Sequence, residues 1–167
     1  MNRVLEKVKE EFLEILPPTA FFFVALHVVA VIRALMARGT PYQPLSTFEI
    51  GIAALILGKS VLIADLLPAI NRFPNRPLIY NVAWKTAIYL VMATAIHYCE
   101  RIVHFGREAG SLSAGFDTML AQIVWPHFWA IEILMLVLIL MYCTSRELIR
   151  VIGREKVIQI FFGPMPA

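Results

Sequence analysis

The chain has 167 residues, of which 59% are hydrophobic and only 16% are charged. Soluble domains average about 45–50% apolar and about 25% charged residues, so this composition excludes an ordinary water-soluble domain. It also excludes a disordered chain, which combines low hydrophobicity with a high net charge, because the net charge here is only +3. The length fits one domain, 1–167, and the composition predicts that this domain lies in a membrane.

The first element in chain order is an amphipathic helix over residues 1–16. Its apolar residues recur at roughly helical spacing with charges between them, which is typical of a helix at a membrane interface or packed on neighbouring helices or subunits. Four glutamates precede the first apolar run, unlike in a secretory signal peptide: Glu6, Glu10, Glu11 and Glu14. We therefore expect the first hydrophobic segment to be retained.

Four apolar stretches follow, and each is long enough to supply the about 20 residues that a membrane-spanning helix needs. They cover about 18–37, 47–70, 78–103 and 120–143, with turn-forming residues between them. A second amphipathic segment covers 145–162, and Gly153 is a point at which it can divide. The expected fold class is all-α: a polytopic membrane protein with a four-transmembrane-helix bundle and amphipathic N- and C-terminal helices.

Loop charge predicts the orientation of these spans. Four spans place both termini and the turn near residue 74 on one side, which holds nine of the fifteen basic residues: Arg3, Lys7, Lys9, Arg72, Arg76, Arg146, Arg150, Arg154 and Lys156. The opposite side holds Arg38, Arg101 and Arg107. Because basic residues are retained in the cytoplasm, we expect a multi-pass protein of the bacterial inner membrane with cytoplasmic N- and C-termini. The loop near 104–119 then lies outside.

Six ionisable residues lie inside the predicted spans, where each is expensive to place: Arg33, Glu49, Lys59, Asp65, Lys85 and Glu132. The depth of each residue along its helix follows from a rise of about 1.5 Å per residue, and residues of opposite charge at similar depth are expected to pair. Asp65 and Lys85 lie at similar distances from the turn, which predicts an ion pair between the second and third spans. The other expected pairs are Arg33 with Glu49 near the outer side and Lys59 with Glu132 near the middle.

Helical spacing places polar and small residues on single faces of two spans. On the second span the shared face holds Gly51, Ala54, Gly58 and Asp65, and small residues there allow another helix to approach closely. On the third span the face holds Asn81, Lys85 and Tyr89. These faces admit two interpretations: ion pairs that fix the register of the helices, or a polar path for ions or protons.

Histidines near the outer side raise a metal or haem site as a further interpretation. His97 and His127 are weak metal candidates, together with Glu100, because their spacing matches no tight ligand motif. Interfacial or hydrogen-bonded histidines are the favoured interpretation. No catalytic or cofactor-binding motif is present, which favours a protein that is not an enzyme and indicates no particular cofactor. The two cysteines are expected to be free, small apolar residues.

Several stretches of sequence carry a resemblance to a known group of proteins. They are Leu57–Asp65, Ile70–Asn81 with Trp84–Thr86, Trp125–Ala130 and Phe161–Gly163. Through them the chain resembles uncharacterised bacterial inner-membrane proteins with four predicted transmembrane spans, over most of its length from about residue 20. The resemblance implies a bacterial inner membrane, and it implies no activity, substrate or cofactor.

Three classes of function remain open. The first is a non-enzymatic structural or regulatory protein, such as a subunit of a membrane complex. The second is a small ion or proton channel or transporter that uses the buried residues Lys59, Asp65, Lys85 and Glu132. The third is a metal- or haem-binding redox membrane protein. The expected partners are the lipid bilayer and either further copies of the chain, as a homo-oligomer, or other membrane subunits. Nucleic acid is not expected, because basic flanks beside anionic lipid explain the net charge.

Overall fold

The computed structural model describes residues 2–37, 46–70, 76–111 and 124–163, together with residues 113, 116 and 120. Across these residues the main helices are α1 (Asn2–Met36), α2 (Thr47–Asp65), α3 (Leu78–Ala109), α5 (Trp125–Ile152) and α6 (Arg154–Phe162). The spans within the first four are long and apolar enough to cross a membrane: Glu14–Met36, Thr47–Asp65, Leu78–Arg107 and Trp125–Ile152. The predicted class, an all-α chain with four membrane spans, is therefore confirmed.

Local sequence explains where several helices begin and end. Ser46 caps α2, because its hydroxyl accepts a hydrogen bond from the Glu49 N–H at 3.2 Å while the Glu49 carboxylate accepts one from the Ser46 N–H at 2.7 Å. α3 ends at Gly110, whose φ of 77° lies in the left-handed region that suits glycine. Gly153 has a φ of 92° and separates α5 from α6, at the division point that the sequence suggests.

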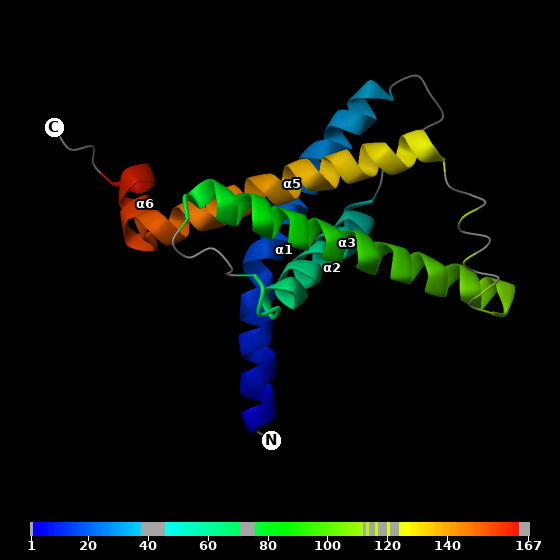
Figure 1. The fold of residues 1–167 in the computed structure, drawn as a ribbon, viewed down its shortest axis with the longest axis horizontal. Helices are drawn as coiled ribbons and strands as arrows, with labels where there is room; N and C mark the ends of the chain where they lie inside the picture. Colours follow the sequence, from blue (N-terminus) through cyan, green and yellow to red (C-terminus); the bar gives the residue numbers. More distant parts are fainter. Residues whose placement is uncertain are drawn as a thin grey trace.

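Helix α1 differs from the prediction, because residues 2–16 and the first span form one continuous helix. Pro17 and Pro18 lie inside this helix. A proline has no N–H to donate, and its ring crowds the carbonyl four residues earlier, so it bends a helix without necessarily ending it. Figure 1 shows the axis of α1 changing direction near its middle, with the N-terminal part extending away from the other helices.

Helix α5 also extends beyond its predicted end. The sequence predicts a fourth span ending at residue 143 and an amphipathic segment from 145, whereas α5 continues unbroken to Ile152. The predicted C-terminal segment is therefore divided: residues 145–152 belong to the span, and α6 alone forms the short helix beyond it. The extension places Arg146 and Glu147 on a membrane-spanning helix, close to the other spans.

The helices pack mainly in chain order, with α1 against α2, α2 against α3, and α3 against α5. Figure 1 shows α3 and α5 crossing while they run in opposite directions. The small-residue face of α2 lies against α1, since a Cβ added to Gly58 would lie 3.2 Å from the Thr19 Cα. The buried core joins these helices through Phe22, Tyr89 and Ile139.

The outward faces of the long helices are apolar. Large hydrophobic residues that are exposed on α1 and α5 include Val24, Val28, Leu35, Ile133, Val137 and Met141. In water such surfaces would be unfavourable, but in a bilayer they contact lipid tails. On α6, Phe161 and Phe162 are almost fully exposed, as expected for a helix with an apolar face at the membrane interface.

Candidate functional site

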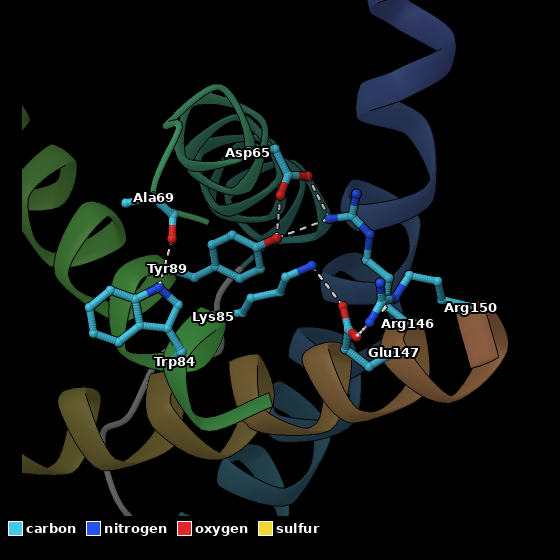
Figure 2. A network of polar contacts seen from close by, with 8 residues as sticks. All are labelled: Asp65, Ala69, Trp84, Lys85, Tyr89, Arg146, Glu147 and Arg150. Carbon is cyan, nitrogen blue, oxygen red and sulfur yellow. Dashed lines mark hydrogen bonds and ion pairs between the residues drawn. The ribbon is translucent and has the colours of Figure 1, made fainter. Parts of the chain in front are cut away.

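A network of charged and hydroxyl groups joins three of the spans at one end of the molecule (Figure 2). Its members come from the end of α2, the first turns of the α3 span and the last turns of α5: Asp65, Lys85, Tyr89, Arg146, Glu147 and Arg150. Spans one and three begin at this end and spans two and four finish there. We call these six residues the charged network.

One half of the charged network centres on Glu147. Its carboxylate is almost completely buried, with 1% of the side chain exposed, and it accepts a bond from the Lys85 ammonium at 2.7 Å. Its second oxygen accepts two bonds from the Arg150 guanidinium, the shorter at 2.6 Å. One buried carboxylate thus satisfies two cations, and the Lys85–Glu147 pair joins α3 to α5.

The other half centres on Asp65, the last residue of α2. One carboxylate oxygen accepts a bond from the Arg146 guanidinium at 2.5 Å, and the other accepts a bond from the Tyr89 hydroxyl. The Tyr89 hydroxyl in turn accepts a bond from Arg146 at 3.0 Å, which closes a three-membered ring of contacts. A carboxylate at a helix C-terminus is disfavoured by the helix dipole, so the arginine offsets that penalty.

Helix geometry explains how neighbouring residues reach different partners. Arg146 and Glu147 are consecutive on α5, and consecutive residues on an α-helix point about 100° apart because a turn takes 3.6 residues. Arg146 therefore reaches α2 while Glu147 reaches α3 (Figure 2). Lys85 and Tyr89 are one turn apart on α3 and share a face with Asn81, and all three are buried, which confirms the inward face predicted for this span.

A further contact braces the turn beside the charged network. The indole N–H of Trp84 donates to the Ala69 carbonyl at 2.8 Å, as Figure 2 shows. This bond ties the segment after α2 to the second turn of α3. Ala69, in the described segment after α2, is thus held beside the turn of α3 that carries Lys85.

A cleft of about 670 Å³ opens beside the charged network. Its charged wall includes Asp65, Arg146 and Arg150, and its apolar wall includes Leu62 and Leu66. Glu14 and Pro18 of α1 also line it. Arg146 and Arg150 keep 44% and 54% of their side chains exposed, so both guanidiniums remain accessible although each is held by a carboxylate.

The structure gives the predicted pair Asp65–Lys85 different partners. Both residues lie in the charged network, but Lys85 binds Glu147 and Asp65 binds Arg146. The physical reason is the longer α5, whose last turns bring Glu147 within bonding distance of Lys85 and Arg146 within bonding distance of Asp65. Asp65 and Lys85 do lie at a similar depth, in one network, but each bonds to a residue of α5.

The other two predicted pairs are not among the ion pairs of the described residues. Glu49 engages Ser46 at the start of α2, and Arg33 lies exposed near the end of α1. Glu132 accepts a hydrogen bond from Thr94 at 3.0 Å, whereas Lys59 lies on the exposed side of α2. Among the described residues, therefore, Arg33–Glu49 and Lys59–Glu132 do not form the ion pairs that the depth count predicts.

The two candidate histidines lie near each other. His97 and His127 line a common pocket of about 320 Å³ with Tyr98 and Arg101. Within the described part of the chain, no three histidine, cysteine, aspartate or glutamate side chains gather closely enough to hold a metal ion. Glu100 lines a neighbouring, mainly apolar pocket of about 440 Å³ that also reaches His97.

Sequence reasoning missed Arg146, Glu147 and Arg150 as functional residues, because it placed them in an interfacial helix. A signal was nevertheless present: only Thr144 and Ser145 separate Arg146-Glu147 from the apolar run, and no glycine or proline occurs before Gly153. An unbroken helix would have brought both residues to the depth of Asp65 and Lys85. Comparison with known proteins adds no assignment, since no family model, curated protein or solved structure matches the chain.

Proposed function

We propose that the chain is a non-enzymatic, multi-pass protein of the bacterial inner membrane that acts as a structural or regulatory subunit of a membrane complex. One observation supports this most strongly. The charged groups at one end bond to one another across α2, α3 and α5, so they serve as a clasp that holds three spans in register. A buried ion pair contributes specificity of arrangement more readily than stability.

The apolar interior beyond the clasp supports this role over conduction. Beyond the charged network the buried core includes apolar side chains such as Ala93, Leu138 and Ile139. The polar groups further along, including the Thr94–Glu132 bond, are separate from the network. The chain would accordingly seal the membrane rather than conduct ions, in contrast to the channel interpretation built on Lys59, Asp65, Lys85 and Glu132.

We further propose that both termini lie in the cytoplasm, which places the clasp on the cytoplasmic side. The excess of basic residues at that end supports this orientation. The bilayer is the first partner, and the exposed apolar faces of α1 and α5 offer contact to a second copy or to another membrane subunit. A reporter enzyme that is active only in the periplasm is expected to be inactive when it is fused to the C-terminus. Activity of the reporter would show that the C-terminus lies in the periplasm and would contradict the proposed orientation.

Proton flux measured in proteoliposomes tests the proposed role. Vesicles holding the purified chain and a trapped pH-sensitive dye are expected to lose an imposed pH gradient no faster than protein-free vesicles. The variant Asp65→Asn serves as the comparison. A flux well above the protein-free rate that disappears in Asp65→Asn would contradict the clasp and favour a proton channel.

A further inference from the structure

The cleft beside the charged network combines charged and apolar walls at the level where the spans end. Its charged wall comes from Arg146 and Arg150 on α5, and its apolar wall from Leu62 and Leu66 at the end of α2. Headgroups lie at this level of a bilayer, directly outside the hydrocarbon core. A cleft that is half charged and half apolar at this depth suits an amphipathic molecule rather than a free ion.

The two arginines have hydrogen-bonding capacity beyond their protein contacts. A guanidinium carries five N–H groups in a planar fork. Arg146 uses its Nη1 for Asp65 and Tyr89, and Arg150 uses Nε and Nη2 for Glu147. These bonds hold both side chains in place, so the outer edges of the guanidiniums are preorganised toward the cleft. Arginine in this form is well suited to phosphate oxygens.

The charge of the site fits one phosphodiester. Three cations, Lys85, Arg146 and Arg150, face two carboxylates, Asp65 and Glu147, which leaves the charged network with one excess positive charge. A phosphodiester carries a single negative charge. Glu14, on α1, also lines the cleft, and a carboxylate there attracts an ammonium group.

We propose that this cleft binds a membrane phospholipid with a primary-amine headgroup. The phosphodiester lies against Arg146 and Arg150, the ammonium points toward Glu14, and an acyl chain runs along Leu62 and Leu66. Basic pockets between membrane-spanning helices are known to recognise lipid headgroups in this way. The proposal requires that the four spans cross a bilayer, but it is independent of which side is cytoplasmic and of whether the chain conducts.

The test is native mass spectrometry of the purified, delipidated chain in detergent, titrated with defined lipids. Dioleoylphosphatidylethanolamine is the main probe. Dioleoylphosphatidylglycerol lacks the amine, dioleoylglycerol lacks the phosphate, and glycerophosphoethanolamine lacks the acyl chains. The phosphatidylethanolamine is expected to bind saturably at one molecule per chain, phosphatidylglycerol more weakly, and the other two not detectably.

Three variants assign the binding to the cleft. Arg150→Gln retains the Lys85–Glu147 pair and hence the fold, and it is expected to weaken binding about tenfold, the loss of one charge-assisted contact. Arg154→Gln is the matched control, because Arg154 is an exposed basic residue in the next turn that does not line the cleft, and its effect should stay below about twofold. Glu14→Gln should remove the preference for ethanolamine over glycerol headgroups.

Several results would overturn the proposal. Equal weakening by Arg150→Gln and Arg154→Gln would show general attraction to surface charge. Binding of dioleoylglycerol as tight as that of the phospholipid would show that the phosphate is not recognised. Tight binding of glycerophosphoethanolamine would show a site for a soluble phosphodiester instead of a lipid. An unchanged headgroup preference in Glu14→Gln would remove the amine from the assignment.

Discussion

At the end of the spans where α2 finishes and α3 begins, ion pairs join three helices. At the opposite end, by contrast, Glu49 bonds to Ser46 three residues away, and the bond from Thr94 to Glu132 that links α3 to α5 lies near the middle of α3. The aromatic rings of Trp125 and Trp129 are 62% and 58% exposed, as suits residues at a headgroup level. The comparison indicates that buried charge orders the helices at one end, while interfacial aromatic residues position the other.

This difference predicts unequal sensitivity to mutation at the two ends. All of the following stability changes refer to reversible unfolding of the purified chain in mixed micelles, titrated with sodium dodecyl sulfate and followed by circular dichroism.

The largest effect is expected at Glu147. Replacing it in Glu147→Leu leaves the Lys85 ammonium buried without a carboxylate, and we expect the free energy of unfolding to fall by about 3–5 kcal/mol. Glu155→Leu is the control, since Glu155 is exposed on α6 and its loss should change stability by no more than about 0.5 kcal/mol. Equal effects at the two positions would mean that the buried Glu147 contributes no more to the free energy of unfolding than an exposed glutamate does.

Gly58→Ala tests how much the close contact between α1 and α2, which involves no charged group, contributes to stability. In Gly58→Ala the new methyl group meets the α1 backbone at Thr19, so we expect a loss of about 1–3 kcal/mol from overpacking. The matched Gly51→Ala meets Phe23 at 3.7 Å, an ordinary contact, and should be neutral or stabilising, because alanine favours a helix more than glycine. If Gly58→Ala were as stable as Gly51→Ala, α1 and α2 would not be in close contact.

Tyr89 tests the hydroxyl that connects Asp65 and Arg146. Tyr89→Phe removes a donor to the carboxylate and an acceptor for the guanidinium, and we expect a loss of about 1.5 kcal/mol. Tyr98→Phe makes the same chemical change toward the opposite end, where no hydroxyl of a charged network is removed, and should have a smaller effect. A larger loss from Tyr98→Phe would reverse the comparison between the two ends.

The smallest effect is expected for the cross-helix bond between Thr94 and Glu132, near the middle of α3 and apart from the charged network. Thr94→Val keeps the shape of the side chain and removes the bond to Glu132 at 3.0 Å. Hydrogen bonds between membrane helices are worth about 0.6 kcal/mol on average, so we expect a loss of that order. A loss comparable with that of Glu147→Leu would mean that this bond stabilises the chain as much as the charged network does.

The sequence predicts the class of this fold because membrane spans follow from composition and length alone. It also predicts the inward face of α3, since Asn81, Lys85 and Tyr89 recur at helical spacing and are buried. The partners were harder to predict, because a depth count compares only the residues it considers and cannot tell which further helix supplies a competing partner. The partners of Asp65 and Lys85 depend on whether the fourth span ends near residue 144 or continues to Gly153. Charged residues at a membrane interface are compatible with both a helix end and a continued helix.

The segment Pro17–Pro18 is a second place where the end of a helix could not be predicted from the sequence. Two prolines between an amphipathic segment and a span suggest a helix boundary, yet α1 continues through them and bends. Proline lowers the stability of a helix locally, but hydrogen bonding in an apolar environment favours a continuous one. Pro18 is also buried, so packing against the neighbouring helices holds the bent segment in place.

The Lys85–Glu147 pair is the most buried contact of the clasp, and a double-mutant cycle tests it directly. The variants are Lys85→Met, Glu147→Leu and the two combined, compared with the unmodified chain in the same unfolding titration. We predict that Glu147→Leu loses about 3–5 kcal/mol and that Lys85→Met loses less, because Arg150 still pairs with Glu147. The combined variant should regain most of the Glu147→Leu loss, since no buried charge is then left unpaired. Additive losses, with the combined variant less stable than either single one, would contradict the clasp.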